Sequence, residues 1–185
     1  MSKNGKLITP SRFVGLHAHS GLSLNDGLGY PQDHMDFAYE NGADALALTD
    51  HGHMNGLPYQ VLHARKMKAN GKNFKPIFGV EAYFNPSLEQ WREEYEKAKQ
   101  EKKKGIKNDI ELSIEDERAS KQKVVDILKK RNHLILIAQN QTGLNNIFKL
   151  VSESYKDENF YRYPRIDYEL LDLYSDGVIA ASACL

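Results

Sequence analysis

Two histidines close an apolar run near the start of the sequence. Residues 13–27 read FVGLHAHSGLSLNDG, so that His17 and His19 are two residues apart and Asp26 follows seven residues later. In an extended strand, side chains two residues apart lie on the same face, and the two imidazoles could therefore hold one metal ion from one side. Two ordinary polar residues at a strand end are the alternative, and the motif alone leaves both interpretations open.

Other apolar runs end in, or contain, residues that bind metals. Asp50 and His51 follow the run ALAL, Glu81 lies within KPIFGVEAYF, and Cys184 closes GVIAASAC. In parallel α/β folds the carboxyl ends of the strands gather on one rim, where sites are assembled. Imidazole, carboxylate and thiolate groups together suit zinc, manganese or iron better than calcium or magnesium. The pattern therefore predicts a site for such ions on the rim of a sheet.

Strand and helix patterns alternate along the chain, as an α/β fold requires. Apolar runs with the length of buried strands cover residues 13–19, 44–51, 75–84, 133–140 and 177–184. Residues 31–41 and 58–70 each have proline near the start and glycine just past the end, which is typical of helices. From Thr142 onward, apolar residues recur at helical spacing. We therefore expect an α/β fold with a parallel sheet.

A charged segment from Ser87 to Lys130 interrupts this alternation. Its first half has one narrow apolar stripe, formed by Leu88, Trp91, Tyr95 and Ala98. The lysines could form a nucleic-acid patch, but acidic residues alternate with them, and a solvated helical face is the better interpretation. The segment is expected to be an insertion helix on the surface.

Composition excludes several classes of protein. The 185 residues are 41% hydrophobic and 27% charged, and 25 basic residues balance 25 acidic ones, so no global field attracts nucleic acid or a membrane. No apolar run is long enough to cross a bilayer, and the first residues lack the apolar core of a signal peptide. Cys184 is the only cysteine, which fits a reducing compartment. We expect a cytoplasmic protein with no membrane partner.

Several spaced motifs resemble one known family. LHAHS with Asp26, ALTDHGHMNG, KPIFGVEAYF, HLILIAQNQTGLNNIFKLVS, YPRIDYELL and IAASACL are similar, in that order, to the N-terminal PHP (polymerase and histidinol phosphatase) domain of bacterial replicative DNA polymerase III alpha subunits. The resemblance runs from about Phe13 to Leu185, apart from the insertion at about 87–130. It implies a distorted seven-stranded parallel (β/α) barrel, truncated here after about five strands, so that residues 1–185 form a partial PHP domain.

The resemblance also implies a set of metal ligands. His17 and His19 would bind a first ion, Glu81 would bridge the first and second, His133 and Cys184 would bind the second, and Asp26 and His51 would bind a third. Up to three zinc, manganese or iron ions are expected, with His17, His19 and Glu81 at the catalytic position. The family's last two ligands, an Asp-x-His pair, have no counterpart before Leu185, and we expect the natural protein to continue and to supply them.

The remaining candidates have structural alternatives. His34 and His63 fall within expected helices without a second ligand on the same face, and His53 is expected to belong to a loop. Asp50 is expected to orient a neighbouring imidazole, because ligand histidines need a hydrogen-bond acceptor behind them. The cluster FYRYPRID at 160–167 could stack on unpaired bases, but packing of a connecting segment is the preferred interpretation.

The expected activity is metal-dependent hydrolysis of phosphodiester bonds. Neighbouring ions can polarise a phosphoryl oxygen and activate water, and the resemblance implies a 3′–5′ proofreading exonuclease acting on the 3′ end of single-stranded DNA. The polymerase core in the same parent chain and other replisome subunits are the expected partners. Two alternatives remain open: a stand-alone histidinol-phosphatase-like phosphoesterase, and a non-catalytic PHP scaffold of the polymerase.

Overall fold

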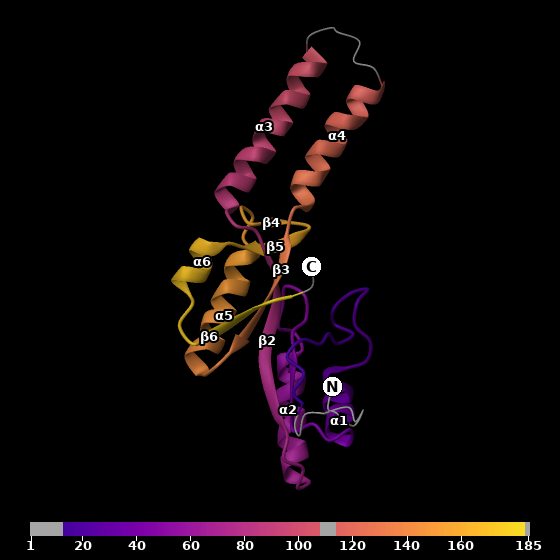
Figure 1. Cartoon of the computed structure of the whole chain (residues 1–185), viewed down its shortest axis with the longest axis vertical. Helices are drawn as coiled ribbons and strands as arrows, with labels where there is room; N and C mark the ends of the chain where they lie inside the picture. The colour runs from indigo at the N-terminus through magenta and orange to yellow at the C-terminus, as the bar shows by residue number, and fades with distance from the viewer. Residues whose placement is uncertain (1–12, 108–113, 184–185) are drawn as a thin grey trace, which may run out of the picture.

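The computed structural model describes residues 13–107 and 114–183, which form an α/β body and a long helical arm (Figure 1). The elements are, in order, α1 (Pro31–Glu40), β1 (Ala45–Leu48), α2 (Leu57–Ala69), β2 (Lys75–Phe84), α3 (Leu88–Lys107), α4 (Ile114–Lys129), β3 (Asn132–Ala138), α5 (Gln141–Ser154), β4 (Phe160–Tyr161), β5 (Tyr163–Ile166), α6 (Tyr168–Leu173) and β6 (Val178–Ser182). The α/β class expected from the sequence is confirmed.

The ten-residue strand β2 is the centre of the sheet. Its continuous apolar sequence is buried along its second half, as expected for a central strand. It pairs with β1 in parallel at its start, with β3 along its second half, and with β5 in parallel at its end. The strand order is β4-β5-β2-β3-β6, with β1 beside β2, so every strand that approaches the candidate site is held directly or indirectly by β2.

The expectation that all strands are parallel is wrong for β3. This strand runs antiparallel to both β2 and β6, and Phe84 at the end of β2 pairs with Asn132 at the start of β3. The reason lies in the connection: α3 and α4 leave the end of β2 and return to the same end (Figure 1). His133 at the start of β3 therefore lies at the same rim as the end of β2, whereas a parallel strand would have placed it at the opposite end.

The first expected strand, 13–19, is also corrected. Among the described residues, this segment makes one isolated bridge, between Gly15 and Leu46, and no continuous ladder. The amide of Ala47 donates to the carbonyl of Gly15, and the amide of Thr49 to that of Ala18, each over 2.8 Å. The segment thus follows the edge of β1 as extended chain, which is sufficient to bring the next residues to the rim.

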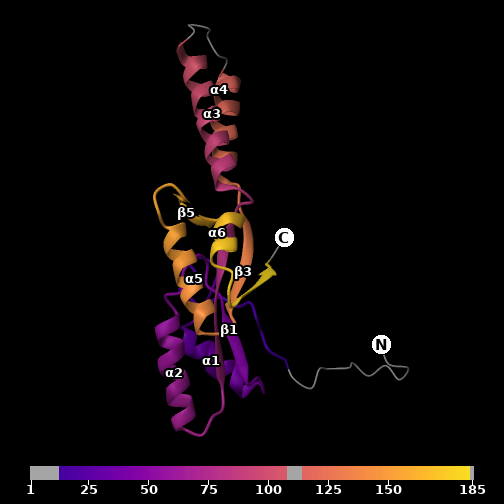
Figure 2. The same ribbon diagram turned by 90° about the vertical axis from the view of Figure 1, so that its left-hand side faces the viewer.

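Helices cover one side of the strands. In Figure 2, α2 and α5 lie on the same side of the sheet. The largest core cluster joins β2, β3, β5 and α5 through Val80, Leu136, Ile147, Leu150 and Ile166. Because side chains alternate along a strand, Glu81 and Tyr83 lie on the opposite face from Val80. That opposite face carries the candidate site.

The charged insertion is a helical hairpin, and the expectation of one helix lying on the surface is wrong. Helices α3 and α4 project away from the body (Figure 1), and Leu88 and Trp91 are buried at the base of the arm against Ile127 and Leu170. The Trp91 indole donates to the Ile127 carbonyl over 2.9 Å. Exposed lysines further along α3 pair with glutamates three or four residues away, which supports the interpretation of a solvated face. No helix among the described residues is long and apolar enough to span a membrane.

Candidate metal centre

Six of the seven side chains expected to bind metal gather at the rim. They line one hollow of about 340 Å³, and they are His17, His19, Asp26, His51, Glu81 and His133. The seventh, Cys184, lies outside the described residues. Within the hollow, three overlapping groups have ligand atoms within 4.8 Å of one another: His17, His19 and Glu81; His19, Asp26 and His51; and His51, Glu81 and His133. Each of these groups could hold a metal ion.

Glu81 is the floor of this metal centre. Its side chain is fully buried on β2, and the Nε2 atoms of His17 and His19 lie 2.7 and 2.8 Å from its Oε2. The Nδ1 atom of His133 lies 2.7 Å from the other oxygen, Oε1. One carboxylate therefore faces imidazoles on both sides, the position that a bridging ligand needs.

Backbone pairing with β2 places His51. The Gly52 amide donates to the Glu81 carbonyl over 2.8 Å, and the Glu81 amide donates to the Asp50 carbonyl over 3.1 Å. Gly52 adopts a positive φ of 69°, and a side chain there would collide with Pro164, so glycine after His51 is required. The His51 ring stacks on Tyr83 with a centroid distance of 5.7 Å. These contacts leave the imidazole little freedom.

A tight loop delivers Asp26. The Gly21 amide donates to the Gly29 carbonyl over 2.7 Å and closes the loop. At Gly27 a Cβ atom would stand 1.8 Å from the Ser20 carbonyl oxygen, so only glycine permits this approach. The Asp26 carboxylate lies 2.7 Å from the Nε2 of His51, and this hydrogen bond holds the pKa of Asp26 below its ordinary value. Asp26 is therefore a charged ligand candidate at the open side of the centre.

Ser23, a residue without any signal in the sequence pattern, connects the centre to a buried carboxylate. Its hydroxyl donates to Asp50 Oδ1 over 2.9 Å and accepts from the His51 amide over 3.0 Å. The Nδ1 of His19 lies 3.2 Å from the hydroxyl oxygen of Ser23. Asp50 also accepts from the amide and the hydroxyl of Ser20. Among the described residues Asp50 accepts from the two serines and not from an imidazole, so the expected orienting role is exerted on His19 indirectly, through Ser23.

This arrangement determines which nitrogen of His19 carries the proton. The Ser23 hydroxyl donates its hydrogen bond to the carboxylate of Asp50 and accepts one from the His51 amide, so its remaining lone pair accepts from Nδ1–H of His19. The Nε2 of His19 then presents a lone pair to the carboxylate of Glu81 at 2.8 Å. The lone pair of His19 Nε2 and the carboxylate oxygen of Glu81 would repel each other at this distance unless both bind a cation. Burial, and next the charge of His51, lower the pKa of His19, so that protonation of the ring is disfavoured.

Two further atoms of the centre point to the same requirement. Oε1 of Glu81 and Nδ1 of His51 are buried and have no hydrogen-bond partner among the described residues. His133 Nδ1 lies close to that oxygen, but the contact lacks hydrogen-bond geometry. Burying a carboxylate oxygen without a hydrogen-bond partner is costly. The donor set of imidazoles and carboxylates with unused lone pairs therefore fits divalent metal ions.

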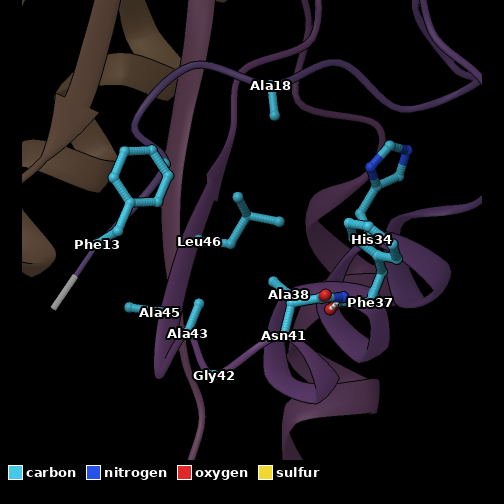
Figure 3. A pocket seen from close by; sticks show the side chains of 11 residues that line it. Phe13, Ala18, His34, Phe37, Ala38, Asn41, Gly42, Ala43, Ala45 and Leu46 are labelled. Atoms are coloured by element: carbon cyan, nitrogen blue, oxygen red, sulfur yellow. Dashed lines mark hydrogen bonds between the residues drawn. The ribbon is translucent and has the colours of Figure 1, made fainter. Parts of the chain in front are cut away.

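The other three histidines lie outside the centre, as expected. His34 Nε2 donates to the Leu28 carbonyl over 2.6 Å, His53 Nε2 lies 3.2 Å from the Leu22 carbonyl, and His63 lies 3.0 Å from Asp36. His34 also borders a hollow of about 460 Å³ between α1, β1 and the 13–18 segment (Figure 3). Its walls are mostly apolar, with Phe13, Phe37 and Leu46 among them, and they offer no ligand cluster.

The 160–167 segment packs against the base of the arm. Arg165 is fully buried over the Trp91 ring, at 4.6 Å from its centroid, and donates to the carbonyls of Tyr161 and Tyr163. Burial lowers its pKa to about 10, so it stays charged at neutral pH. Phe160 and Tyr161 at the hairpin end are 41% and 36% exposed. The expected packing role therefore holds for Arg165, while the two aromatic rings remain accessible.

Comparison with known proteins identifies the family of this chain. The PHP domain family matches residues 15–185. DNA polymerase III subunit alpha of Aquifex aeolicus is 38% identical over 173 residues, which are 94% of this chain and 12% of that protein. The same subunit of Borreliella burgdorferi is 36% identical over 175 residues, which are 95% of this chain and 12% of that protein. An amidohydrolase structure from Chromobacterium violaceum aligns with a TM-score of 0.40 and 16% identity over 76% of this chain and 34% of its own. The family match over nearly the whole sequence shows that the chain belongs to the PHP domain family.

Proposed function

We propose that this chain is the PHP domain of a bacterial replicative DNA polymerase III alpha subunit and that it hydrolyses phosphodiester bonds. The observation that carries the proposal is Glu81, a fully buried carboxylate faced by imidazoles on both of its oxygens. The relatives named above are DNA polymerase III alpha subunits, of which this chain spans about 12%. The substrate is the 3′ end of single-stranded DNA, and the polymerase core is part of the same parent chain.

The three groups support the following ligand roles. His17, His19 and Glu81 would hold a first ion, and Glu81 with His133 would hold a second. The resemblance to the family adds Cys184 to the ligands of the second ion. Asp26 and His51 hold a third ion, with His19 beside them. Nitrogen and carboxylate donors with one thiolate favour zinc, manganese or iron. His51 belongs to two of the three groups, so its imidazole lies within reach of both the second and the third candidate position.

The residues of the centre suit a substrate that approaches from solvent. Divalent ions bound here would polarise a phosphoryl oxygen and lower the pKa of a bound water. Glu81 lies fully buried at the bottom of the hollow. At its mouth, the side chain of His17 is 36% exposed and that of Asp26 is 52% exposed. Asp50 and Ser23 keep His19 in the tautomer that presents Nε2 to the ion. An open mouth admits the flexible end of a polynucleotide.

Two other functions are possible for a PHP domain, and the hydrolysis experiment described below distinguishes them from the proposed one. A histidinol-phosphatase-like phosphoesterase would use the same rim, but similarity to polymerase subunits over 94% of the chain argues against it. A non-catalytic scaffold that holds the polymerase or other replisome subunits would not need six ligand-type side chains around one hollow. The proposal also requires the cytoplasm, where bacterial chromosomes are replicated.

Hydrolysis of labelled DNA tests the proposal. The chain, loaded with manganese or zinc, is incubated in excess over single-stranded DNA, so that slow hydrolysis is also detected. We expect stepwise shortening from the 3′ end that a chelator stops and that Glu81→Gln abolishes. Intact DNA together with bound metal would support the scaffold. Preference for a small phosphate monoester would support the phosphatase.

A further inference from the structure

One cationic side chain beside the metal centre has no role in the chemistry described so far. Arg131 immediately precedes β3 and stands two residues before His133, so that the two side chains share a face. Its guanidinium lies 3.9 Å from the ring centroid of Tyr163 and 5.4 Å from that of Tyr83. The Tyr83 ring in turn lies 5.2 Å from the His133 ring. Arg131 is thus separated from the centre by one aromatic ring.

The guanidinium is held in place but its charge is not neutralised. Its one hydrogen bond within the described residues runs from Nη1 to the Lys129 carbonyl, over 3.0 Å. Tyr163 supports its face, and no carboxylate forms an ion pair with it in the described part of the chain. The charge of Arg131 also contributes, after burial, to the lowered pKa of Arg165. The guanidinium groups of Arg131 and Arg165 are therefore close enough to interact electrostatically.

We propose that Arg131, supported by Tyr163, binds the backbone phosphate of single-stranded DNA that neighbours the phosphodiester group in the metal centre. The inference rests on the proposed function and adds a second contact to it. A planar guanidinium offers paired donors that match a phosphate, and an arginine stacked on an aromatic ring keeps that orientation. The exposed rings of Phe160 and Tyr161 lie on the same β4–β5 hairpin as Tyr163, where bases of a strand can stack. These neighbours favour a polynucleotide over a small phosphate ester.

Binding of a fluorescent oligodeoxythymidine tests this contact, with fluorescence anisotropy measured from low to high salt. We expect Arg131→Gln to weaken binding about tenfold at low salt, as for loss of one charge-assisted contact. The slope of log Kd against log salt should fall by about 0.7, the value for one phosphate contact to a single strand. Arg131→Lys should restore most of the slope, because the charge remains. Arg118→Gln, an exposed arginine on α4, is the matched control and should leave both quantities unchanged.

Hydrolysis of bis(4-nitrophenyl) phosphate, a diester with no neighbouring phosphate, separates this inference from the proposed function. Arg131→Gln should leave that rate unchanged, while KM for the oligonucleotide rises. If the wild-type chain hydrolyses neither substrate, the proposed function fails, and the anisotropy measurement still decides the role of Arg131. Unchanged oligonucleotide binding in Arg131→Gln would overturn the inference. A purely structural role would also overturn it, shown by a fall in melting temperature in both Arg131 variants without recovery of binding in Arg131→Lys.

Discussion

The hydroxyl of Ser23 donates a hydrogen bond to Asp50 over 2.9 Å, and this bond orients ligand candidates of the metal centre although neither residue is one of them. Because the hydroxyl hydrogen of Ser23 points to a buried carboxylate, the Ser23 oxygen acts as an acceptor toward His19 and His51. It accepts from the Nδ1–H of His19 and from the amide of His51. One hydroxyl therefore positions two imidazoles that belong to different parts of the sequence. Asp50 is 3% exposed, so little water competes for these bonds.

Ser23→Ala removes this control and should lower metal affinity about 10- to 100-fold, the usual cost of losing a partner behind a ligand. The His19 ring is then free to rotate and to adopt the other tautomer. Competition with a chromogenic chelator measures the affinity. Ser23→Thr keeps the hydroxyl and should retain most of it. Ser152→Ala, a serine whose hydroxyl bonds the Phe148 carbonyl on α5, controls for the chemical change. Equal affinity in Ser23→Ala and wild type would contradict the assigned role.

Glu81→Gln should remove more than one ion per chain. The carboxylate belongs to two of the three ligand groups, and both of its oxygens lie within 2.8 Å of an imidazole nitrogen. A neutral amide binds divalent ions weakly, so one substitution weakens two sites. Metal analysis of dialysed protein gives the count. Glu93→Gln, on the exposed face of α3, should keep the wild-type content. Loss of a single ion, or of none, would show that Glu81 does not bridge.

The fold was most predictable where the sequence pattern is continuous. The run 75–84 predicts β2 to the residue, because a strand buried in the middle of a sheet is apolar throughout. The helix signals at Pro31 and Pro58 place α1 and α2 within one or two residues. The sense of β3 could not be predicted this way. Strand direction depends on where a connection returns, and the charged residues of the arm do not show that they form a hairpin.

The ligand candidates of the site could be predicted from their residue types, but the residues that orient them could not. His17, His19 and Glu81 attract attention because imidazoles and carboxylates have known ligand chemistry, and the structure brings them together. Ser23 gave no such signal, since serine is common in loops and its role depends on a bond to Asp50, 27 residues away. The resemblance supplied His133 as a ligand, whereas its place at the rim depends on the antiparallel direction of β3, which the sequence pattern did not predict.

Acid should destabilise the metal-free chain. The pKa of His19 is lowered in the folded state, so the unfolded chain binds a proton at higher pH than the folded chain does. Stability is therefore fully present above the ordinary histidine value of about 6.5 and is lost as the pH falls below it. Urea unfolding in the presence of a chelator at pH 7.5 and pH 5 measures the loss. His19→Gln cannot titrate and should show a smaller loss; an equal loss in both proteins would assign the effect to other groups.

Gly27→Ala should disrupt the centre without removing any ligand. The added methyl group would overlap the Ser20 carbonyl oxygen at 1.8 Å, so the loop has to move, and Asp26 moves with it away from His51. Backbone atoms cannot yield as a flexible side chain can, and we expect loss of about 1–3 kcal/mol in stability as well as weaker binding of the third ion. Asp26→Asn is the paired variant: it weakens the same ion but leaves the loop in place. Metal content and urea unfolding of the two variants together separate the effects. A Gly27→Ala protein with wild-type stability and wild-type metal content would mean that the loop does not approach Ser20 as closely as described.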